Sequence, residues 1–183
     1  MHNDLPKIYC FIDKFNKEHI KKLNKNIAII YRNYDEKLDI SLIKNINQFC
    51  KKNRRKFFLA NNIKTAIKLN LDGVYIPSFN KKMDINYYTK KKKFFILGSA
   101  HNLTEIRNKE AQKVNCIFLS PLFFIPKSKK FLGIHKFNSL SYFTKKKIIC
   151  LGGINKNNLK KTKLINTYGV ASISLFKKKI KYI

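Results

Sequence analysis

Eight short apolar runs recur along the chain at intervals of roughly 20 residues, and polar, lysine-rich stretches separate them. Most of these runs are rich in β-branched and aromatic side chains, which is typical of buried strands. The pattern predicts eight strands, at residues 7–13, 27–31, 57–60, 74–76, 94–97, 116–119, 148–151 and 170–176.

Between the predicted strands, apolar residues recur at the three- and four-residue spacing of amphipathic helices. The clearest helix follows Asp39, a residue type that caps helix N-termini, and its inward positions are Leu42, Ile43, Ile46, Phe49 and Cys50. Asn102, followed three residues later by Glu105, resembles a capping box. The further predicted helices are residues 16–24, 63–67, 84–93, 102–115 and 137–146, and a helix that follows Asn155 and ends at Gly169.

Strands that alternate with helices predict an α/β protein with a parallel sheet. Eight such units predict a (β/α)8 TIM barrel, formed by a single domain over residues 1–183. The chain is shorter than the usual range for this fold, so we expect a reduced eighth helix. An open flavodoxin-like sheet is the structural alternative. In a barrel, the functional loops follow the carboxyl ends of the strands.

Composition places the chain among globular proteins. The chain has 183 residues, 44% of them hydrophobic, and it has no run of about 18 uncharged apolar residues that could span a membrane. Its first residues lack the pattern of a signal peptide. Four cysteines lie far apart without metal-ligand spacing. We therefore expect a cytoplasmic protein with reduced thiols and no membrane partner.

The charge is strongly positive, because 40 Lys and Arg residues face 10 Asp and Glu residues. A formal net charge of +30 would attract polyanions such as nucleic acids. However, lysine is spread over the whole chain, and no recognisable nucleic-acid module accompanies it. A solvated basic surface is therefore the favoured interpretation, and a role in nucleic-acid binding is disfavoured.

The predicted seventh strand ends in a pair of glycines, Gly152 and Gly153. Adjacent glycines allow a backbone to pass close to a ligand without Cβ clashes. A helix beginning just beyond them would present unpaired N–H groups, which suits a phosphate. A plain tight turn explains the same two residues equally well.

Five short motifs resemble those of the thiamine phosphate synthase and thiazole tautomerase family. They are LDGVYI at residues 71–76, SAH at 99–101, LSPLF at 119–123, LGGI at 151–154 with Asn158, and GVASIS at 169–174. Their order and spacing match the family's, and the resemblance extends from about residue 27 to residue 176. It implies the barrel fold and a transferase active in thiamine biosynthesis.

The resemblance also implies a reaction. A synthase of this family joins an aminopyrimidine methyl diphosphate to a thiazole phosphate and releases diphosphate, with Mg²⁺ as cofactor. By resemblance, the substrate- and phosphate-binding residues would be Gly152, Gly153, Ile173, Ser174, Ser99 and Ser128. Arg32 and Lys129 would be the catalytic cations that stabilise the departing diphosphate. The implied partners are small phosphorylated substrates, and a homodimer is a further expectation.

The chain departs from the family where acids would bind the metal. Asn61 or Asn62, after the third predicted strand, and Asn80, after the fourth, stand where the family carries aspartates. These three are the candidate metal ligands, although an amide supplies no charge and hard cations favour carboxylates. The alternative is therefore a non-catalytic or tautomerase-like binder of thiamine-pathway phosphates. Pro121, where we expect a histidine in tautomerases, disfavours the tautomerase branch.

Overall fold

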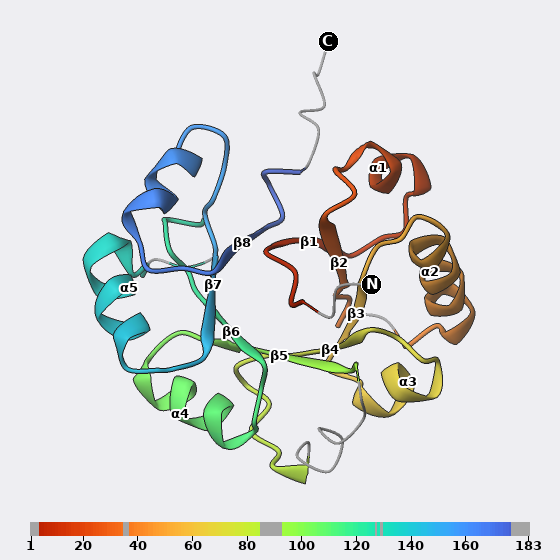
Figure 1. Cartoon of the computed structure of the whole chain (residues 1–183), viewed down its shortest axis with the longest axis horizontal. Helices are drawn as coiled ribbons and strands as arrows, with labels where there is room; N and C mark the ends of the chain where they lie inside the picture. Colours follow the sequence, from red (N-terminus) through yellow and green to blue (C-terminus); the bar gives the residue numbers. More distant parts are fainter. Residues whose placement is uncertain (1–3, 35–36, 85–92, 127, 129, 177–183) are drawn as a thin grey trace.

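The computed structural model describes residues 4–34, 37–84, 93–126, 128 and 130–176. Eight parallel strands close into a barrel in sequence order, and β1 pairs with β8 through Ile8 opposite Val170 (Figure 1). The strands are β1 (Ile8–Ile12), β2 (Ile27–Tyr31), β3 (Phe57–Ala60), β4 (Gly73–Ile76), β5 (Phe95–Ala100), β6 (Cys116–Leu119), β7 (Lys147–Leu151) and β8 (Gly169–Ser172). The predicted (β/α)8 barrel is confirmed, and the open-sheet alternative is wrong.

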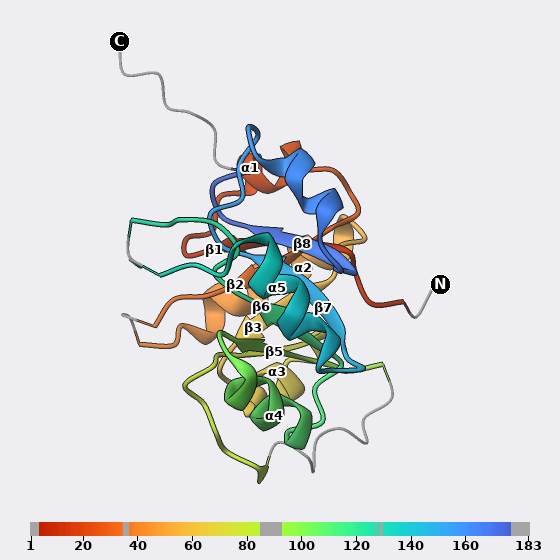
Figure 2. The same cartoon turned by 90° about the vertical axis from the view of Figure 1, so that its left-hand side faces the viewer.

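The helices stand outside the ring of strands, as Figure 1 shows. They are α1 (Lys17–Lys22), α2 (Ile40–Lys52), α3 (Ile63–Lys68), α4 (Leu103–Ala111), α5 (Gly133–Tyr142) and the 3₁₀ helix η2 (Leu159–Leu164). Both predicted N-caps are confirmed, since the side chain of Asp39 accepts from the Leu42 N–H and that of Asn102 from the Glu105 N–H. The second bond of the predicted capping box differs, because the Glu105 carboxylate accepts from the His101 N–H. Figures 1 and 2 place α5 beside β6 and β7.

Two layers of apolar side chains hold the barrel together. Inside it, aromatic rings pack edge to face, with centroids of Phe118 4.9 Å from Tyr9 and 5.4 Å from Tyr75. The interior is therefore a packed core, so the site must lie on the loops at one end. The second layer fills the space between the strands and the helices, and includes Ile20, Ile43 and Ile106.

Several predicted elements differ from the structure, and two others lie outside the described residues. The helix expected after Asn155 is wrong, because a 3₁₀ helix without buried residues begins only at Leu159. The Asn155 side chain accepts from the N–H groups of Asn157 and Asn158, a local turn that competes with a helix. The predicted helix at 137–146 begins at Gly133 and ends at Tyr142, and the last strand ends at Ser172 instead of residue 176. The predicted helix at 84–93 and any eighth helix beyond residue 176 lie outside the described residues.

Candidate functional site

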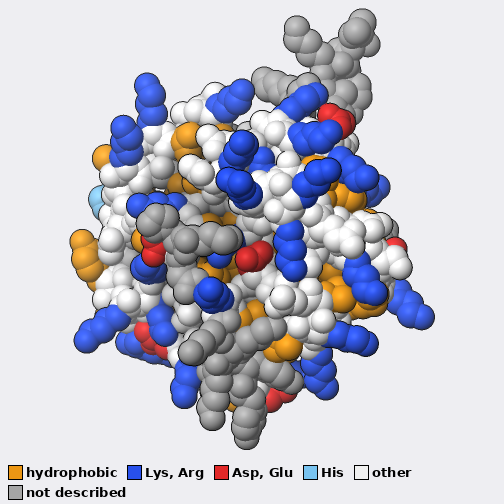
Figure 3. Space-filling view, turned by 45° about the vertical axis from the view of Figure 1, so that its right-hand side comes forward, with side chains coloured by type: hydrophobic (Ala, Val, Ile, Leu, Met, Phe, Trp, Pro, Cys, Tyr) orange, Lys and Arg blue, Asp and Glu red, His pale blue; other side chains and the backbone are white. Residues whose placement is uncertain are grey.

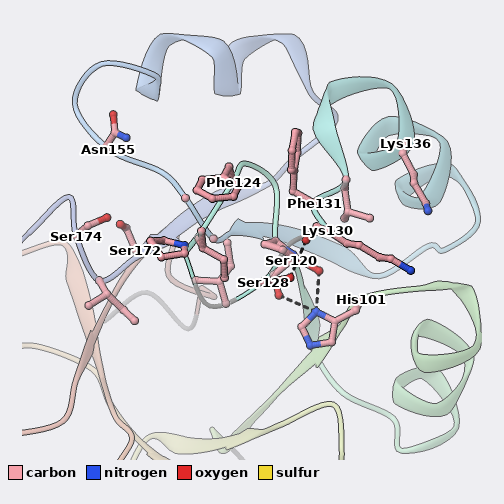
Figure 4. Close-up of a pocket in the computed structure, with 18 of the residues that line it drawn as sticks. His101, Ser120, Phe124, Ser128, Lys130, Phe131, Lys136, Asn155, Ser172 and Ser174 are labelled. Carbon is pink, nitrogen blue, oxygen red and sulfur yellow. Dashed lines mark hydrogen bonds between the residues drawn. The ribbon is translucent and has the colours of Figure 1, made fainter.

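A pocket of about 990 Å³ opens at the carboxyl ends of β5 to β8 (Figure 4). Arg32, which follows β2, reaches it from the other side of the barrel. The remaining lining residues come from the last residues of β7 and β8, from the loops after β5, β6, β7 and β8, and from α5. They are His101, Ser120, Pro121, Phe124, Ile125, Pro126, Ser128, Lys130, Phe131, Leu132, Lys136, Leu151, Gly152, Gly153, Asn155, Ser172, Ile173 and Ser174. Of the site residues predicted from the sequence, the pocket brings together Arg32, Ser128, Gly152, Gly153, Ile173 and Ser174.

The glycine pair is required by the packing of the backbone. Gly152 and Gly153 have φ values of 93° and 69°, a region that favours glycine. A Cβ on Gly152 would lie 2.7 Å from Pro121, and one on Gly153 would lie 2.6 Å from the carbonyl oxygens of Phe123 and Phe124. The end of β7 and the loop after β6 therefore touch backbone to backbone. This contact explains both glycines without a ligand.

Backbone N–H groups are available beside these glycines. No hydrogen bond joins the N–H of Gly152, Gly153, Ile173 or Ser174 to another described residue. The Ser174 hydroxyl donates to the Ile154 carbonyl at 3.1 Å, and Asn158 donates to the Gly153 carbonyl at 2.8 Å. Unpaired N–H groups beside a hydroxyl are the donors that a phosphate accepts from.

Cationic side chains stand on two sides of the pocket. The Arg32 guanidinium lies over the Phe11 ring, 4.9 Å from its centroid. Arg32 and Asp13 also line a second, small cavity. Figure 4 shows Lys130, Lys136 and His101 on the side away from Ser172 and Ser174. Sequence reasoning missed Lys136, because lysines are so frequent in this chain that no single one carries a signal.

His101 lines the pocket in a defined tautomer. Its Nδ1 lies 2.7 Å from the Ser120 carbonyl oxygen, which can only accept, so Nδ1 carries the proton. Whenever the ring is neutral, Nε2 is therefore its acceptor nitrogen. The backbone N–H of His101 donates to the Glu105 carboxylate at 2.8 Å, so the same residue also forms part of the start of α4.

The three predicted metal ligands use their side-chain oxygens elsewhere. Asn80 Nδ2 donates to Asn61 Oδ1 at 2.7 Å, and Asn80 Oδ1 accepts from the Lys82 N–H at 3.0 Å. Asn62 Oδ1 caps α3 by accepting from the Thr65 N–H at 3.0 Å. In the described part of the chain, no group of three His, Cys, Asp or Glu residues could hold a metal ion. Mg²⁺ favours carboxylates, so these residues do not fit a magnesium site.

A buried lysine supports the loop that carries Asn80. Lys109 on α4 is fully buried, and its Nζ donates to the carbonyls of Pro77 and Asn80 and to Gln112 Oε1, each at 2.8 Å. Burial lowers the pKa of Lys109 to about 8, although Glu105 acts in the opposite direction. The sequence did carry a signal here, because Lys109 and Gln112 continue the inward face that begins with Ile106.

The remaining predicted site residues lie elsewhere. Ser99 is buried in β5, where it hydrogen-bonds Tyr75 in the barrel interior, and it does not line the pocket. The Ser128 hydroxyl lines the pocket but donates to the Lys130 carbonyl at 2.8 Å. Lys129 lies outside the described residues. Tyr75, the fifth residue of the LDGVYI motif, is buried among aromatic rings and packs in the barrel interior.

Positive charge covers the surface broadly. Figure 3 shows Lys and Arg side chains spread over the described part of one face, with few Asp and Glu side chains among them. They do not follow a single stripe or groove on this face, in keeping with the solvated basic surface expected from the sequence. In the described residues, no helix is long and apolar enough to cross a membrane.

The strands form a closed parallel barrel, and the pocket lies on the loops that follow the strands. The chain is therefore a (β/α)8 barrel protein whose pocket lies at the carboxyl-terminal end of the barrel, where such proteins carry their sites. Residues 17–176 match the family model described as thiamine monophosphate synthase. The chain therefore belongs to the thiamine monophosphate synthase family.

Individual relatives agree with this family. The chain is 30% identical over 182 residues to a thiamine-phosphate synthase of Prochlorococcus marinus, with 90% of this chain and 50% of that protein covered. It thus spans about half the length of this relative. It is 25% identical over 192 residues to an Aquifex aeolicus protein with the provisional name thiamine-phosphate synthase 2, with 94% and 98% covered. The solved thiamine phosphate pyrophosphorylase of Pyrococcus furiosus has the same fold, with a TM-score of 0.74, 18% identity and 92% and 85% covered.

Proposed function

We propose that this chain is a divergent thiamine phosphate synthase that joins an aminopyrimidine methyl diphosphate to a thiazole phosphate. The observation that carries the proposal is the convergence, in one pocket, of backbone donors and cations. Gly152, Gly153, Ile173 and Ser174 line one side of it, and Arg32, Lys130 and Lys136 also line it. The family membership supports the same activity.

The donors after β7 and β8 would bind the thiazole phosphate. Their N–H groups have no partner among the described residues, and the Ser174 hydroxyl can turn from the Ile154 carbonyl to a phosphate oxygen. Phosphate after the last two strands is the common arrangement in barrels of this kind. The exposed rings of Phe124 and Phe131 offer flat apolar surface for the two heteroaromatic rings.

The cations would act on the leaving group. In the reaction, the thiazole nitrogen donates its electron pair to the pyrimidine methylene carbon. The carbon–oxygen bond breaks, and its electron pair leaves with the diphosphate. Arg32, held in place over Phe11, would stabilise this developing negative charge, and the proposal assigns Lys129 the same task.

The test is formation of thiamine phosphate from the two phosphorylated substrates by the purified chain. We expect measurable product, and we expect the Arg32→Gln variant to lower kcat at least 10-fold, because a charge at the leaving group is lost. The Lys44→Gln variant removes one exposed charge from α2 and is the matched control. No product at high protein concentration would contradict the proposal.

A second candidate is a non-catalytic or tautomerase-like binder of thiamine-pathway phosphates. His101 favours this candidate, because its Nε2 is a base in the pocket and Ser120, its partner, directly precedes the position where we expect the tautomerase histidine. Calorimetry that shows thiazole phosphate binding, together with absent turnover, would select this candidate. Loss of a proton-transfer activity in His101→Gln would identify the tautomerase form.

A further inference from the structure

We infer that the barrel end formed by β3 and β4 holds no divalent cation, and that the pocket binds phosphate through protein donors and cations alone. The inference rests on the proposed function for the nature of the ligand. It concerns the chain's own residues Asn61 and Asn80, and Lys109 as the residue that positions Asn80.

The side-chain amides of Asn61 and Asn80 have a defined direction. An amide can often be turned around without a visible difference, so its oxygen must be assigned from its partners. Here the Lys82 N–H is a donor at 3.0 Å, so the atom of Asn80 that it meets must be the oxygen. The NH₂ group of Asn80 then donates to Asn61, and the Asn61 atom that accepts, 2.7 Å away, must be its side-chain oxygen. The network therefore points each amide oxygen at a protein donor.

The buried side chain of Lys109 holds the loop that carries Asn80. The Lys109 ammonium has three protons, and three acceptors surround it: the carbonyls of Pro77 and Asn80 and the side-chain oxygen of Gln112. Gln112 in turn donates to the carbonyls of Asn80 and Lys82, at 3.0 and 2.9 Å. Hydrogen bonds from Lys109 and Gln112 thus hold the loop from Pro77 to Lys82 against α4. These bonds hold the backbone of Asn80 in place, so its side chain starts from a fixed position beside Asn61.

The charges around the barrel mouth also disfavour a divalent cation. A divalent cation in a protein needs carboxylates to offset its loss of water. Asn61 and Asn80 are neutral, and Asp13 lines a small cavity together with Arg32. Among the described residues, no group of three His, Cys, Asp or Glu residues could hold a metal ion. The pocket itself is lined by Arg32, Lys130 and Lys136, which attract a phosphate and repel a metal ion. Protein cations therefore occupy the electrostatic role that a metal ion would otherwise fill.

The test is a titration with Mn²⁺, a paramagnetic substitute for Mg²⁺, followed by water-proton relaxation. We expect the wild-type chain to show no saturable site tighter than about 1 mM. The Asn61→Asp/Asn80→Asp variant should gain such a site, because two carboxylates then face each other. The Asn45→Asp/Asn157→Asp variant changes the net charge equally at remote exposed positions and should not gain one.

Inorganic phosphate provides the second measurement. Its affinity for the wild-type chain should be the same, within twofold, in 1 mM EDTA and in 5 mM Mg²⁺. A wild-type Mn²⁺ site that disappears in Asn61→Ala, or a phosphate affinity that rises at least 10-fold with Mg²⁺, would overturn the inference.

The role of Lys109 is tested in the background of the two aspartates. Lys109→Met in the Asn61→Asp/Asn80→Asp variant should weaken the new Mn²⁺ site at least 10-fold, since residue 80 is then no longer held. Lys109→Arg, which keeps the charge, should restore part of it, whereas unchanged Mn²⁺ affinity in Lys109→Met would refute the positioning role. The Mn²⁺ titrations need neither substrate nor turnover, so their failure is distinguishable from failure of the proposed synthase activity.

Discussion

The two sides of the barrel mouth satisfy their polar groups in opposite ways. After β7 and β8, the backbone N–H groups of Gly152, Gly153, Ile173 and Ser174 have no partner among the described residues. After β3 and β4, Asn61, Asn62 and Asn80 engage every side-chain oxygen in a hydrogen bond. An open set of donors can bind a ligand without rearrangement, whereas a paired set must first be broken. We therefore propose that the β7–β8 side of the mouth (the open side) binds the ligand, and that the β3–β4 side (the paired side) has a structural role.

The largest effect on stability and phosphate binding is expected from adding a side chain at Gly153, on the open side. Gly153→Ala should destabilise the fold by about 3–4 kcal/mol and abolish phosphate binding, because the new Cβ meets two carbonyl oxygens at 2.6 Å. Gly133→Ala is the control, since Gly133 has a similar φ of 67° but open space around it. It should cost about 1 kcal/mol. Urea unfolding of both variants measures the difference, and equal losses would show that φ alone explains Gly153.

On the paired side, the contribution of Lys109 to the free energy of unfolding should depend on pH. Lys109→Met should destabilise the protein, because the carbonyl of Pro77 loses its buried donor. Burial holds the pKa of Lys109 at about 8 instead of 10.5, so the folded wild type carries a charge penalty below pH 8. This penalty disappears as pH rises from 8 to 10.5, and the cost of the substitution should therefore grow by up to about 3 kcal/mol over that range.

The measurement is the difference in unfolding free energy between wild type and Lys109→Met at pH 7 and pH 10.5. The buried thiols Cys10, Cys50 and Cys150 have pKa values raised by burial to about 12 and destabilise the fold as pH rises above 9. They are present in both proteins, so their contribution cancels in the difference. A difference that stays constant with pH would contradict the lowered pKa of Lys109.

A smaller effect is expected from the hydroxyl on the open side. Ser174→Ala should weaken phosphate binding about 5- to 10-fold, because one hydrogen bond to the anion is lost. Ser141→Ala is the matched control, since the Ser141 hydroxyl also donates to a backbone carbonyl but lies on α5, away from the pocket. Calorimetry with inorganic phosphate measures both, and equal affinities would remove Ser174 from the site.

The smallest effect concerns Asn62 on the paired side. Asn62→Ala should lower stability by about 1 kcal/mol through loss of the α3 cap and leave phosphate affinity unchanged. A thermal melt and a phosphate titration measure the two quantities separately. Weaker phosphate binding in this variant would show that the paired side takes part in the site.

Much of the molecule follows from local patterns in the sequence. The eight apolar runs at a regular spacing predict the eight strands, because a strand buried on both faces must be apolar almost throughout. Asp39 and Asn102 mark helix starts because a cap is a contact between residues three positions apart. The five family motifs predict which strand ends carry the pocket, and Arg32, Gly152 and Ser174 all line it.

Other features depend on contacts between distant segments, which no local pattern contains. The glycine pair could be a turn or a phosphate site from sequence alone, and the approach of Pro121, Phe123 and Phe124 shows the packing requirement. The buried ammonium of Lys109 is defined by carbonyls about 30 residues away, at separations of 32 and 29. The hydrogen bond between Asn80 and Asn61 likewise forms only because β3 and β4 lie side by side. Sequence thus determines which groups stand at the barrel mouth, and tertiary structure decides which of them remain free, because hydrogen bonds across the fold satisfy some and leave others open.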